Sequence, residues 1–489
     1  MEPKGFGPIR TLDLPHSRTA SHPIKKATLT KLVPPGPRPA REPHATIPPM
    51  NSPSLPLAGP TSAPARRKIH RRPVAHVAFV AVLSIVVAGC GIFGPAPSAA
   101  GPTASPTTPP DPAIVYATIE EQVRTIRGLE ELVAVEPRIL DAAALTDYVK
   151  EQFRKDNPAD LVEANERLLK VLGLFPADAS LADLYIGLLS SQVAGLYNPK
   201  DKALYVVSRS GALGPAEKTT FAHEYTHALQ DQNFGLDKLN LDATGDGDGA
   251  IARLSLVEGD ATLLMSLWQI DNLTQAEIIR LLAESLNPAL TGPLEAMPAV
   301  LRESLLFPYT SGLTFTQRLH ADGGWAAVDA AFAKPPASTE QVIHPEKYEG
   351  NEKPMVVDLP DDLAARMGTG WSLGLEDTLG EFQLKVWLAN AADGAATEQG
   401  DATKAAAGWG GDRVALLYGP GGATAAVIDS QWDSPSDAAE FAAQAELVVA
   451  SVADAGEVLA PAGGTSVRVI LAPSDDVVSR LSIALGRGG

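Results

Sequence analysis

The chain divides at about residue 112 into two parts of different character, and this division limits what can fold. Residues 1–112 are rich in proline and contain only one sustained apolar run, whereas the 377 residues that follow have the mixed composition of globular protein. A folded part of that size accommodates one large domain and one smaller domain, each with its own core. We therefore expect folded structure only from about residue 113 onward.

The charge is as uneven as the proline content. Residues 1–89 contain 13 lysines and arginines against three acidic residues, so the rest of the chain contains 27 basic and 55 acidic side chains, a net charge of −28. A folded part this acidic repels the phosphate backbone of nucleic acids. We therefore predict no nucleic-acid partner.

Cys90 is the single cysteine of the chain, which excludes an intrachain disulfide, and its surroundings indicate another role. A basic stretch at 66–72 precedes an uncharged apolar run, Val74 to Val87, that is too short to span a bilayer comfortably. Small residues then lead directly into Cys90, and this arrangement resembles the lipobox signal peptide of bacterial lipoproteins. The resemblance implies cleavage before Cys90, lipid (palmitate) on its sulfur and new amino terminus, and anchoring at the extracytoplasmic face of the cell membrane. An uncleaved membrane anchor that buries Cys90 is the alternative.

These patterns divide the chain into five parts. If translation begins at Met50, the leader before Cys90 has 40 residues; under either start we expect no fold in the first part. The predicted parts are a Pro-rich extension at 1–64, a lipoprotein signal peptide at 65–89, the lipidated cysteine and a flexible tether at 90–112, a large folded domain at 113–350 and a smaller accessory domain at 351–489.

A helix that opens at Pro215 contains the main chemical signal, the segment His223-Glu224-Tyr225-Thr226-His227. Histidines four residues apart share one helical face and can bind one ion. Glu224 lies one step around the helix, where a carboxylate can take a proton from a water molecule that zinc activates. A surface helix with incidental histidines is the alternative. We expect zinc, because Zn²⁺ prefers imidazole and carboxylate ligands in this arrangement.

A catalytic zinc site needs a third protein ligand. Glu258 and Asp260 are the candidates, on a helix expected to begin near Ala250; they lie about 200° apart around the helix axis at 100° per residue. The apolar residues of this helix share the sector of Glu258, so Glu258 is predicted to point inward and Asp260 toward a neighbouring helix. A buried carboxylate is costly unless it is paired or bound to a metal. Gly259 is predicted to lie where two helices approach closely.

The HEYTH segment followed by Val-Glu-Gly-Asp-Ala resembles the gluzincin clan of zinc metallopeptidases over about residues 180–345. The resemblance implies zinc on His223, His227 and Glu258, Glu224 as general base, and peptide or protein substrates. It also implies that the strand before the catalytic helix, Lys202–Ser208, pairs with the substrate. Two motifs of the clan are missing, since Thr262 replaces an expected aspartate and no Gly-x-Met-Glu-Asn segment occurs, so exopeptidase activity is not supported.

Tyr309 precedes a helix expected to end near His320, and Tyr-x-x-Gly here is similar to clan members in which a tyrosine hydroxyl stabilises the oxyanion. Such a donor suits the chemistry, although a core aromatic at a helix start explains Tyr309 equally well. His344 is a second candidate for this role. It lies in the polar segment 338–348, for which the alternatives are a cleft lining and a cap on the domain; we favour the cap.

The C-terminal part contains no catalytic signal. It is expected to contain strands at 413–418 and 424–429 around a glycine turn, a helix at 436–452, a strand at 466–471 and a helix at 475–485. The fold class is therefore α+β, with a helix-rich zincin-like metallopeptidase domain that carries a small edge sheet, followed by a smaller α+β domain.

The predicted function is that of a membrane-anchored zinc peptidase, with endopeptidase activity favoured. The alternative is a catalytically silent zincin-like lipoprotein that serves as a binding or cell-envelope scaffold. The intact set of His223, Glu224 and His227 disfavours that alternative.

Overall fold

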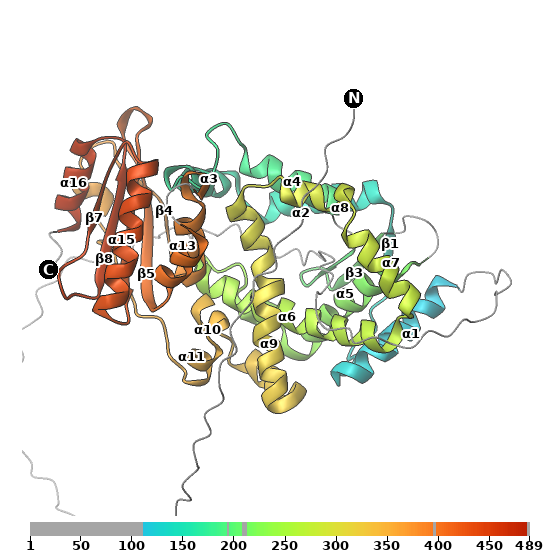
Figure 1. The fold of residues 1–489 in the computed structure, drawn as a ribbon. Coiled ribbons are helices and arrows are strands. Elements are labelled where there is room, and N and C mark those ends of the chain that lie inside the picture. The colour runs from blue at the N-terminus through green and yellow to red at the C-terminus, as the bar shows by residue number, and fades with distance from the viewer. Residues whose placement is uncertain (1–110, 193–194, 208–212, 395–397, 487–489) are drawn as a thin grey trace, which may run out of the picture. The chain divides into compact units, whose positions relative to one another are not determined.

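The computed structural model describes residues 111–192, 195–207, 213–394 and 398–486, all of which belong to one compact unit, 70–489. The described chain is helix-rich with two small sheets, which is an α+β class as predicted (Figure 1). The predicted signal peptide, Cys90 and nearly all of the tether lie outside the described residues. Among the described helices, none has the length and apolar character needed to cross a membrane.

The first elements are helices whose ends follow from local sequence. Asp111 accepts a hydrogen bond from the backbone of Ala113 at the start of α1, and Gly128 ends that helix with φ of 73°, a conformation that glycine adopts at little cost. No described helix crosses Pro137 or Asn157-Pro158, because proline lacks the backbone N–H that a helix interior needs. The elements are α1 Pro112–Arg127, β1 Arg138–Leu140, α2 Ala142–Asp156, α3 Ala159–Val171 and α4 Leu181–Gln192.

A three-stranded sheet follows, with β2 (Gly195–Asn198) and β3 (Ala203–Val207) in the order β1-β3-β2. Strand β3 pairs in parallel with β1 and antiparallel with β2, so it is central. The prediction that Lys202–Ser208 pairs with a substrate is therefore wrong, because both edges of the described strand are already occupied. The sequence from about Leu181 to Leu196 has a pattern that predicts one helix, and this prediction is wrong at its end, because Gly195–Asn198 pairs with β3 and forms a sheet edge.

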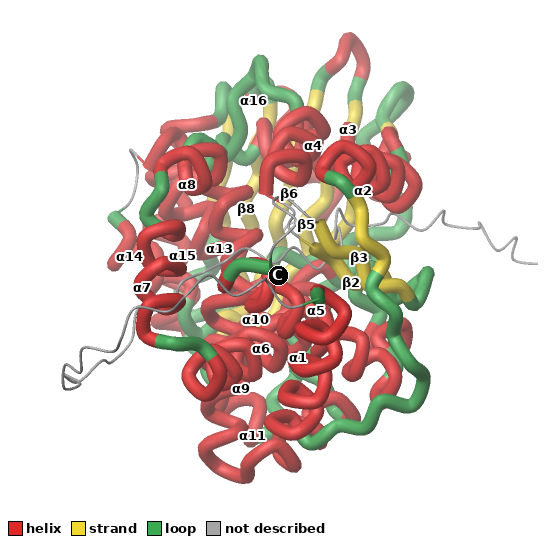
Figure 2. The backbone as a smooth tube through the Cα atoms, turned by 90° about the vertical axis from the view of Figure 1, so that its right-hand side faces the viewer, coloured by secondary structure: helices red, strands yellow, loops and turns green. Residues whose placement is uncertain are grey.

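Three long helices hold the centre of the N-terminal part: α5 (Pro215–Phe234), α6 (Gly247–Asn272) and α9 (Ala299–Ala333). Helix α5 packs on β2 and β3 on one side and on α6 on the other (Figure 2). Helices α6 and α9 meet at Gly259 and Gly312, where a Cβ on Gly259 would overlap the carbonyl of Gly312. The predicted close approach at Gly259 is therefore confirmed. The shorter elements between them are η1 Leu236–Leu239, α7 Gln275–Ser285 and α8 Pro288–Glu295.

Helix α9 differs from its prediction at both ends. Tyr309 was expected to precede a helix, but it lies inside α9, which continues through Pro308. The helix also continues beyond His320, with non-helical backbone at Gly323 and Gly324. Packing against α6 over much of its length explains why a single proline does not end it.

The C-terminal part is built on a five-stranded antiparallel sheet in the order β4-β5-β6-β8-β7. The predicted hairpin, the long helix, the strand from Ser466 and the last helix are confirmed, whereas β4, β7, α13 and α14 were not foreseen. The elements are α10 Thr339–Ile343, α11 Pro345–Glu349, α12 Leu363–Arg366, β4 Ser372–Asp377, α13 Gly380–Asn390, η2 Ala391–Gly394, α14 Gln399–Ala406, β5 Trp409–Tyr418, η3 Pro420–Gly422, β6 Thr424–Trp432, α15 Pro435–Val452, β7 Ala455–Leu459, β8 Ser466–Ala472 and α16 Asp475–Leu485.

One hydrophobic core connects this sheet to the N-terminal helices. Residues of α3, α6, α9, α13 and the inner sheet face belong to a single buried cluster, and the indole N–H of Trp387 donates a hydrogen bond to the carbonyl of Leu172 at 3.1 Å. A separate cluster lies on the other sheet face, under α12 and α16. The side chains on the two sides of the predicted boundary at 350/351 thus pack together in one hydrophobic core.

Candidate metal centre

Helix α5 is embedded in the protein rather than lying on its surface. Pro215 and Glu217 open it in the manner of a helix start, and Gly235 ends it in the left-handed region. One face, with Phe221, Tyr225 and Leu229, packs into a hydrophobic cluster with α1 and β3. The face with the two histidines is directed toward α6, which explains how polar side chains come to be fully enclosed.

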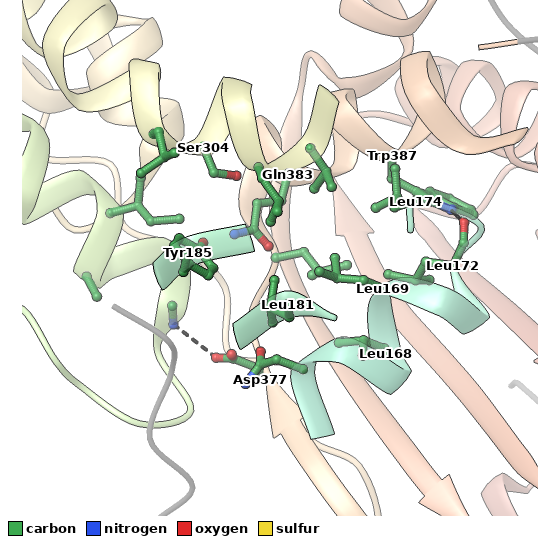
Figure 3. A pocket seen from close by; sticks show the side chains of 18 of the residues that line it. Leu168, Leu169, Leu172, Leu174, Leu181, Tyr185, Ser304, Asp377, Gln383 and Trp387 are labelled. Atoms are coloured by element: carbon green, nitrogen blue, oxygen red, sulfur yellow. Dashed lines mark hydrogen bonds between the residues drawn. The ribbon is translucent and has the colours of Figure 1, made fainter. Parts of the chain in front are cut away.

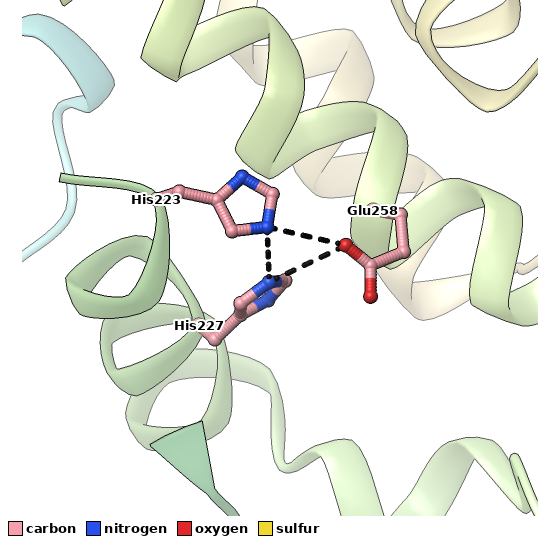
Figure 4. A group of neighbouring side chains, drawn as sticks. All are labelled: His223, His227 and Glu258. Atoms are coloured by element: carbon pink, nitrogen blue, oxygen red, sulfur yellow. Dashed lines mark hydrogen bonds and ion pairs between the residues drawn. The ribbon is translucent and has the colours of Figure 1, made fainter. Parts of the chain in front are cut away.

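Three predicted ligands converge on one point between α5 and α6 (Figure 4). The Nε2 atoms of His223 and His227 are 3.1 Å apart, and Glu258 Oε2 lies 3.3 Å and 3.5 Å from them. All three residues are buried. Ligands held about 2.0–2.1 Å from a tetrahedral zinc ion are separated from one another by about 3.3 Å. The three atoms therefore already have the spacing that such an ion requires.

The charges at this point favour a cation. Glu258 Oε2 is buried and accepts no hydrogen bond from the described residues, although it faces two imidazole rings. Burial alone would raise the pKa of Glu258, but the His227 charge and the two imidazole contacts lower it to about 2. Burial alone would lower the pKa of His227, and the Glu258 carboxylate reverses the direction and raises it. A positive charge on His227 thus compensates Glu258 in the absence of metal, a role that a bound metal ion can take.

Glu224 is buried beside this group and is not one of its three converging residues. Its Oε2 accepts a hydrogen bond of 2.7 Å from the backbone N–H of Tyr197 in β2. Because this N–H donates to Glu224, it is not one of the amides that face β3; successive amides of a strand point to opposite sides. The unpaired side of the edge strand therefore holds Glu224 in position.

The two candidates for the oxyanion donor have different surroundings. The Tyr309 ring lies on α9 against the ring of His223, with centroids 6.1 Å apart, so Tyr309 borders the ligand group. His344 Nε2 is 2.9 Å from Glu381 of α13, and the hydrogen bond to this carboxylate raises the pKa of His344. The structure thus engages His344 with the C-terminal part of the chain.

Asp260 points away from the three ligands, as predicted, and pairs with Arg127 of α1, with Nε and Oδ1 2.8 Å apart. Sequence reasoning missed Gln230, whose side-chain oxygen lies 2.7 Å from Nδ1 of His227. Its position three residues after His227 places it on the same face of the helix, and that spacing could have identified it.

An apolar pocket of about 180 Å³ lies between α3, α4, α6, α9 and α13 (Figure 3). Its lining includes Leu254, one helical turn before Glu258, and Pro308, next to Tyr309. A second pocket of about 230 Å³ is lined by residues of β2, and Leu241 borders both. His223, His227 and Glu258 line neither of these two pockets, although other residues of α6 line the first.

Comparison with known proteins gives one family match. The model of a domain family of unknown function (DUF8575) matches residues 369–481, which include the C-terminal sheet and none of the residues around Glu258. No curated protein and no solved structure matches the chain.

Proposed function

We propose that this protein is a zinc-dependent peptidase with a zincin-like catalytic domain, acting as an endopeptidase. The single observation that carries the proposal is the group of His223, His227 and Glu258, with Glu224 fixed beside it by the edge strand. Three protein ligands of this kind leave a fourth position for water, which is the composition of catalytic zinc sites.

The residues around the site have separate roles in peptide hydrolysis. When bound by His223, His227 and Glu258, zinc supplies a Lewis acid that polarises a carbonyl group and lowers the pKa of water. Glu224 takes the proton of the attacking water and passes it to the leaving amine. The hydroxyl of Tyr309 donates a hydrogen bond to the oxyanion that develops at the scissile carbonyl.

The edge strand and the pockets support a peptide as substrate. Strand β2 pairs on one side only within the described sheet, and an extended peptide can add to such an edge beside the Tyr197 N–H, which Glu224 already occupies. The leucine-lined pocket offers space for an apolar side chain near α6 and α9. Both features favour a protein chain over a small molecule as the substrate.

The test measures zinc per molecule of dialysed full-length protein and its hydrolysis of unfolded casein, with and without a chelator. Wild type is expected to contain one zinc and to lose activity with the chelator. Glu224→Gln should keep the zinc and lose at least ~10²-fold in turnover, because the general base is missing. Glu217→Gln, the same substitution in the first turn of α5, is the control and should remain active.

Near-normal turnover in Glu224→Gln would rule out its proposed role. A wild-type protein that binds no zinc and cleaves nothing would favour the alternative of a scaffold.

We further propose that the protein is anchored to the membrane by lipid on Cys90, on the sequence evidence of the basic, apolar and small-residue segments before it. Cys90→Ser should leave uncleaved precursor and abolish labelling by a fatty-acid probe in cells. Ser84→Ala, in the apolar run, should still be labelled. Unchanged labelling of Cys90→Ser would overturn the lipoprotein assignment.

A further inference from the structure

A chain of buried hydrogen bonds leads away from the candidate metal centre. His227 Nδ1 lies 2.7 Å from Gln230 Oε1, and the Gln230 amide nitrogen donates to Asp260 Oδ2 at 2.9 Å. Asp260 in turn accepts two hydrogen bonds from Arg127, at 2.8 Å and 3.2 Å. Gln230, Asp260 and Arg127 are each 0% exposed. The chain thus runs from a predicted ligand on α5, through α6, to α1.

The order of donors and acceptors in this chain has one solution. The Gln230 amide nitrogen also donates to the carbonyl of Val257 at 3.0 Å, so both of its hydrogens meet atoms that can only accept. Asp260 remains such an acceptor because Arg127, which stays protonated, binds both of its oxygens. The Gln230 oxygen must therefore face the imidazole.

This orientation determines the tautomer of His227. An amide oxygen cannot donate, so Nδ1 of His227 must carry the proton. In the neutral, metal-binding form of the ring Nε2 then has the free lone pair, and it is Nε2 that lies 3.1 Å and 3.5 Å from the other two candidate ligand atoms. Outer hydrogen bonds of this kind orient histidine ligands and raise metal affinity.

We propose that Gln230, Asp260 and Arg127 are positioning residues that hold His227 in the tautomer able to bind zinc. The inference rests on the proposed zinc site. Its physical consequence is that metal affinity depends on a residue of α1, which is separated from Asp260 by 133 positions in the sequence.

A purely structural role for the Arg127–Asp260 pair is the competing explanation, because buried ion pairs are weak evidence of function. Arg127 also pairs with Asp329 at 2.7 Å and lies over the ring of Trp325, so it has structural contacts of its own. Gln230, which connects His227 to Asp260, separates the two explanations. Zinc binding depends on the donor and acceptor atoms of Gln230 only if the Arg127–Asp260 pair has a positioning role.

The experiment measures zinc affinity of the full-length protein by chelator competition, together with the Co²⁺ absorption spectrum and thermal unfolding of the metal-free protein. Gln230→Met should weaken zinc binding by about 10- to 100-fold and change the Co²⁺ spectrum, because Nδ1 loses its acceptor. Asp329→Asn is the control, since it removes a carboxylate from Arg127 but leaves the route to His227 intact. Its zinc affinity should stay within about twofold of wild type, as expected for a change outside the hydrogen-bonded route.

A reciprocal exchange sharpens the test. Gln230→Glu alone places two carboxylates against each other and should lose zinc affinity. Adding Asp260→Asn gives the new carboxylate at position 230 a donor at position 260, although the Val257 carbonyl still faces a carboxylate oxygen. The double variant should therefore regain part of the affinity, at least about tenfold over the single variant, whereas two unrelated losses would add to each other.

The outcomes separate this inference from the proposed function. Zinc-loaded wild type with unchanged affinity in Gln230→Met, or a double variant no better than Gln230→Glu, would overturn the positioning role alone. A zinc-free wild type would overturn the zinc site and this inference together.

Discussion

Helix α6 passes through two regions rich in buried carboxylates that differ in what surrounds the oxygens. At its middle, Glu258 faces imidazole nitrogens, and its Oε2 accepts no hydrogen bond within the described part of the chain. At its start lies a group of aspartates, Asp248, Asp377 and Asp412, which we call the junction because it joins α6 to the C-terminal sheet. There, backbone N–H groups of Gly247, Leu379 and Gly380 and side chains of Thr339 and Trp409 donate to the carboxylates.

The pKa values of the carboxyl groups shift in opposite directions in the two regions. The pKa of Glu258 is lowered to about 2 because the histidine charge outweighs burial. At the junction burial dominates, so the pKa of Asp377 rises to about 7 and that of Asp412 to about 6, despite the amides that bind them. Burial of a carboxylate therefore does not identify a ligand site. The useful sign is a buried carboxylate oxygen that faces imidazole nitrogens rather than backbone N–H groups.

The largest expected effect is on zinc affinity, and the test replaces one carboxylate in each of the two regions. Glu258→Ala should lower zinc affinity by more than the roughly 100-fold typical of changes outside the ligand set, because a ligand itself is removed. Asp412→Asn should bind zinc like wild type, since its amide oxygen still accepts from Leu379 or Gly380. Zinc competition on both full-length variants measures this. Equal losses in the two would show that the comparison is wrong.

A second test uses the raised pKa of Asp377, whose ordinary value is 3.8. Between about pH 4 and 7 the folded protein holds a proton that the unfolded chain has released, so the free energy of unfolding falls as pH rises through this window. Asp377→Asn removes that dependence. From pH 5 to 8, wild type should therefore lose about 2–3 kcal/mol more than the variant, measured by urea unfolding.

Asp412→Asn should show the same pattern with the window ending near pH 6. If Asp377→Asn loses stability equally at both pH values, then hydrogen bonds rather than charge dominate the junction.

The comparison also shows which features sequence reasoning can reach. His223, His227 and Glu258 are linked by helical spacing within two adjacent helices, and local periodicity was sufficient to select Glu258 over Asp260. Strand β2 was missed because Gly195–Asn198 follows a helical pattern directly and becomes a strand by pairing with β3. Arg127 could not be connected to the site, since its partner Asp260 is distant in sequence. Pairing and long-range ion pairs are properties of the folded chain.

The smallest expected effect on activity concerns a tyrosine beside the Glu258 region, compared with a tyrosine that lies outside both regions. Tyr309 borders His223, whereas Tyr348 of α11 donates its hydroxyl to the carbonyl of Lys334, away from the ligand group. Loss of an oxyanion donor typically lowers turnover by about 10²–10³-fold when it is a main contributor. A single tyrosine that shares this task with a metal ion should matter less, so we expect about a tenfold loss of kcat in Tyr309→Phe.

The measurement is steady-state peptide hydrolysis by zinc-loaded Tyr309→Phe and Tyr348→Phe, with their unfolding temperatures. Tyr309→Phe should reduce kcat while leaving KM and stability nearly unchanged, because the ring and its packing remain. Tyr348→Phe should do the reverse, losing about 1 kcal/mol of stability with its hydrogen bond and no activity. If Tyr309→Phe changes stability and leaves kcat intact, Tyr309 is a core aromatic beside the site, and the oxyanion must be stabilised by other groups.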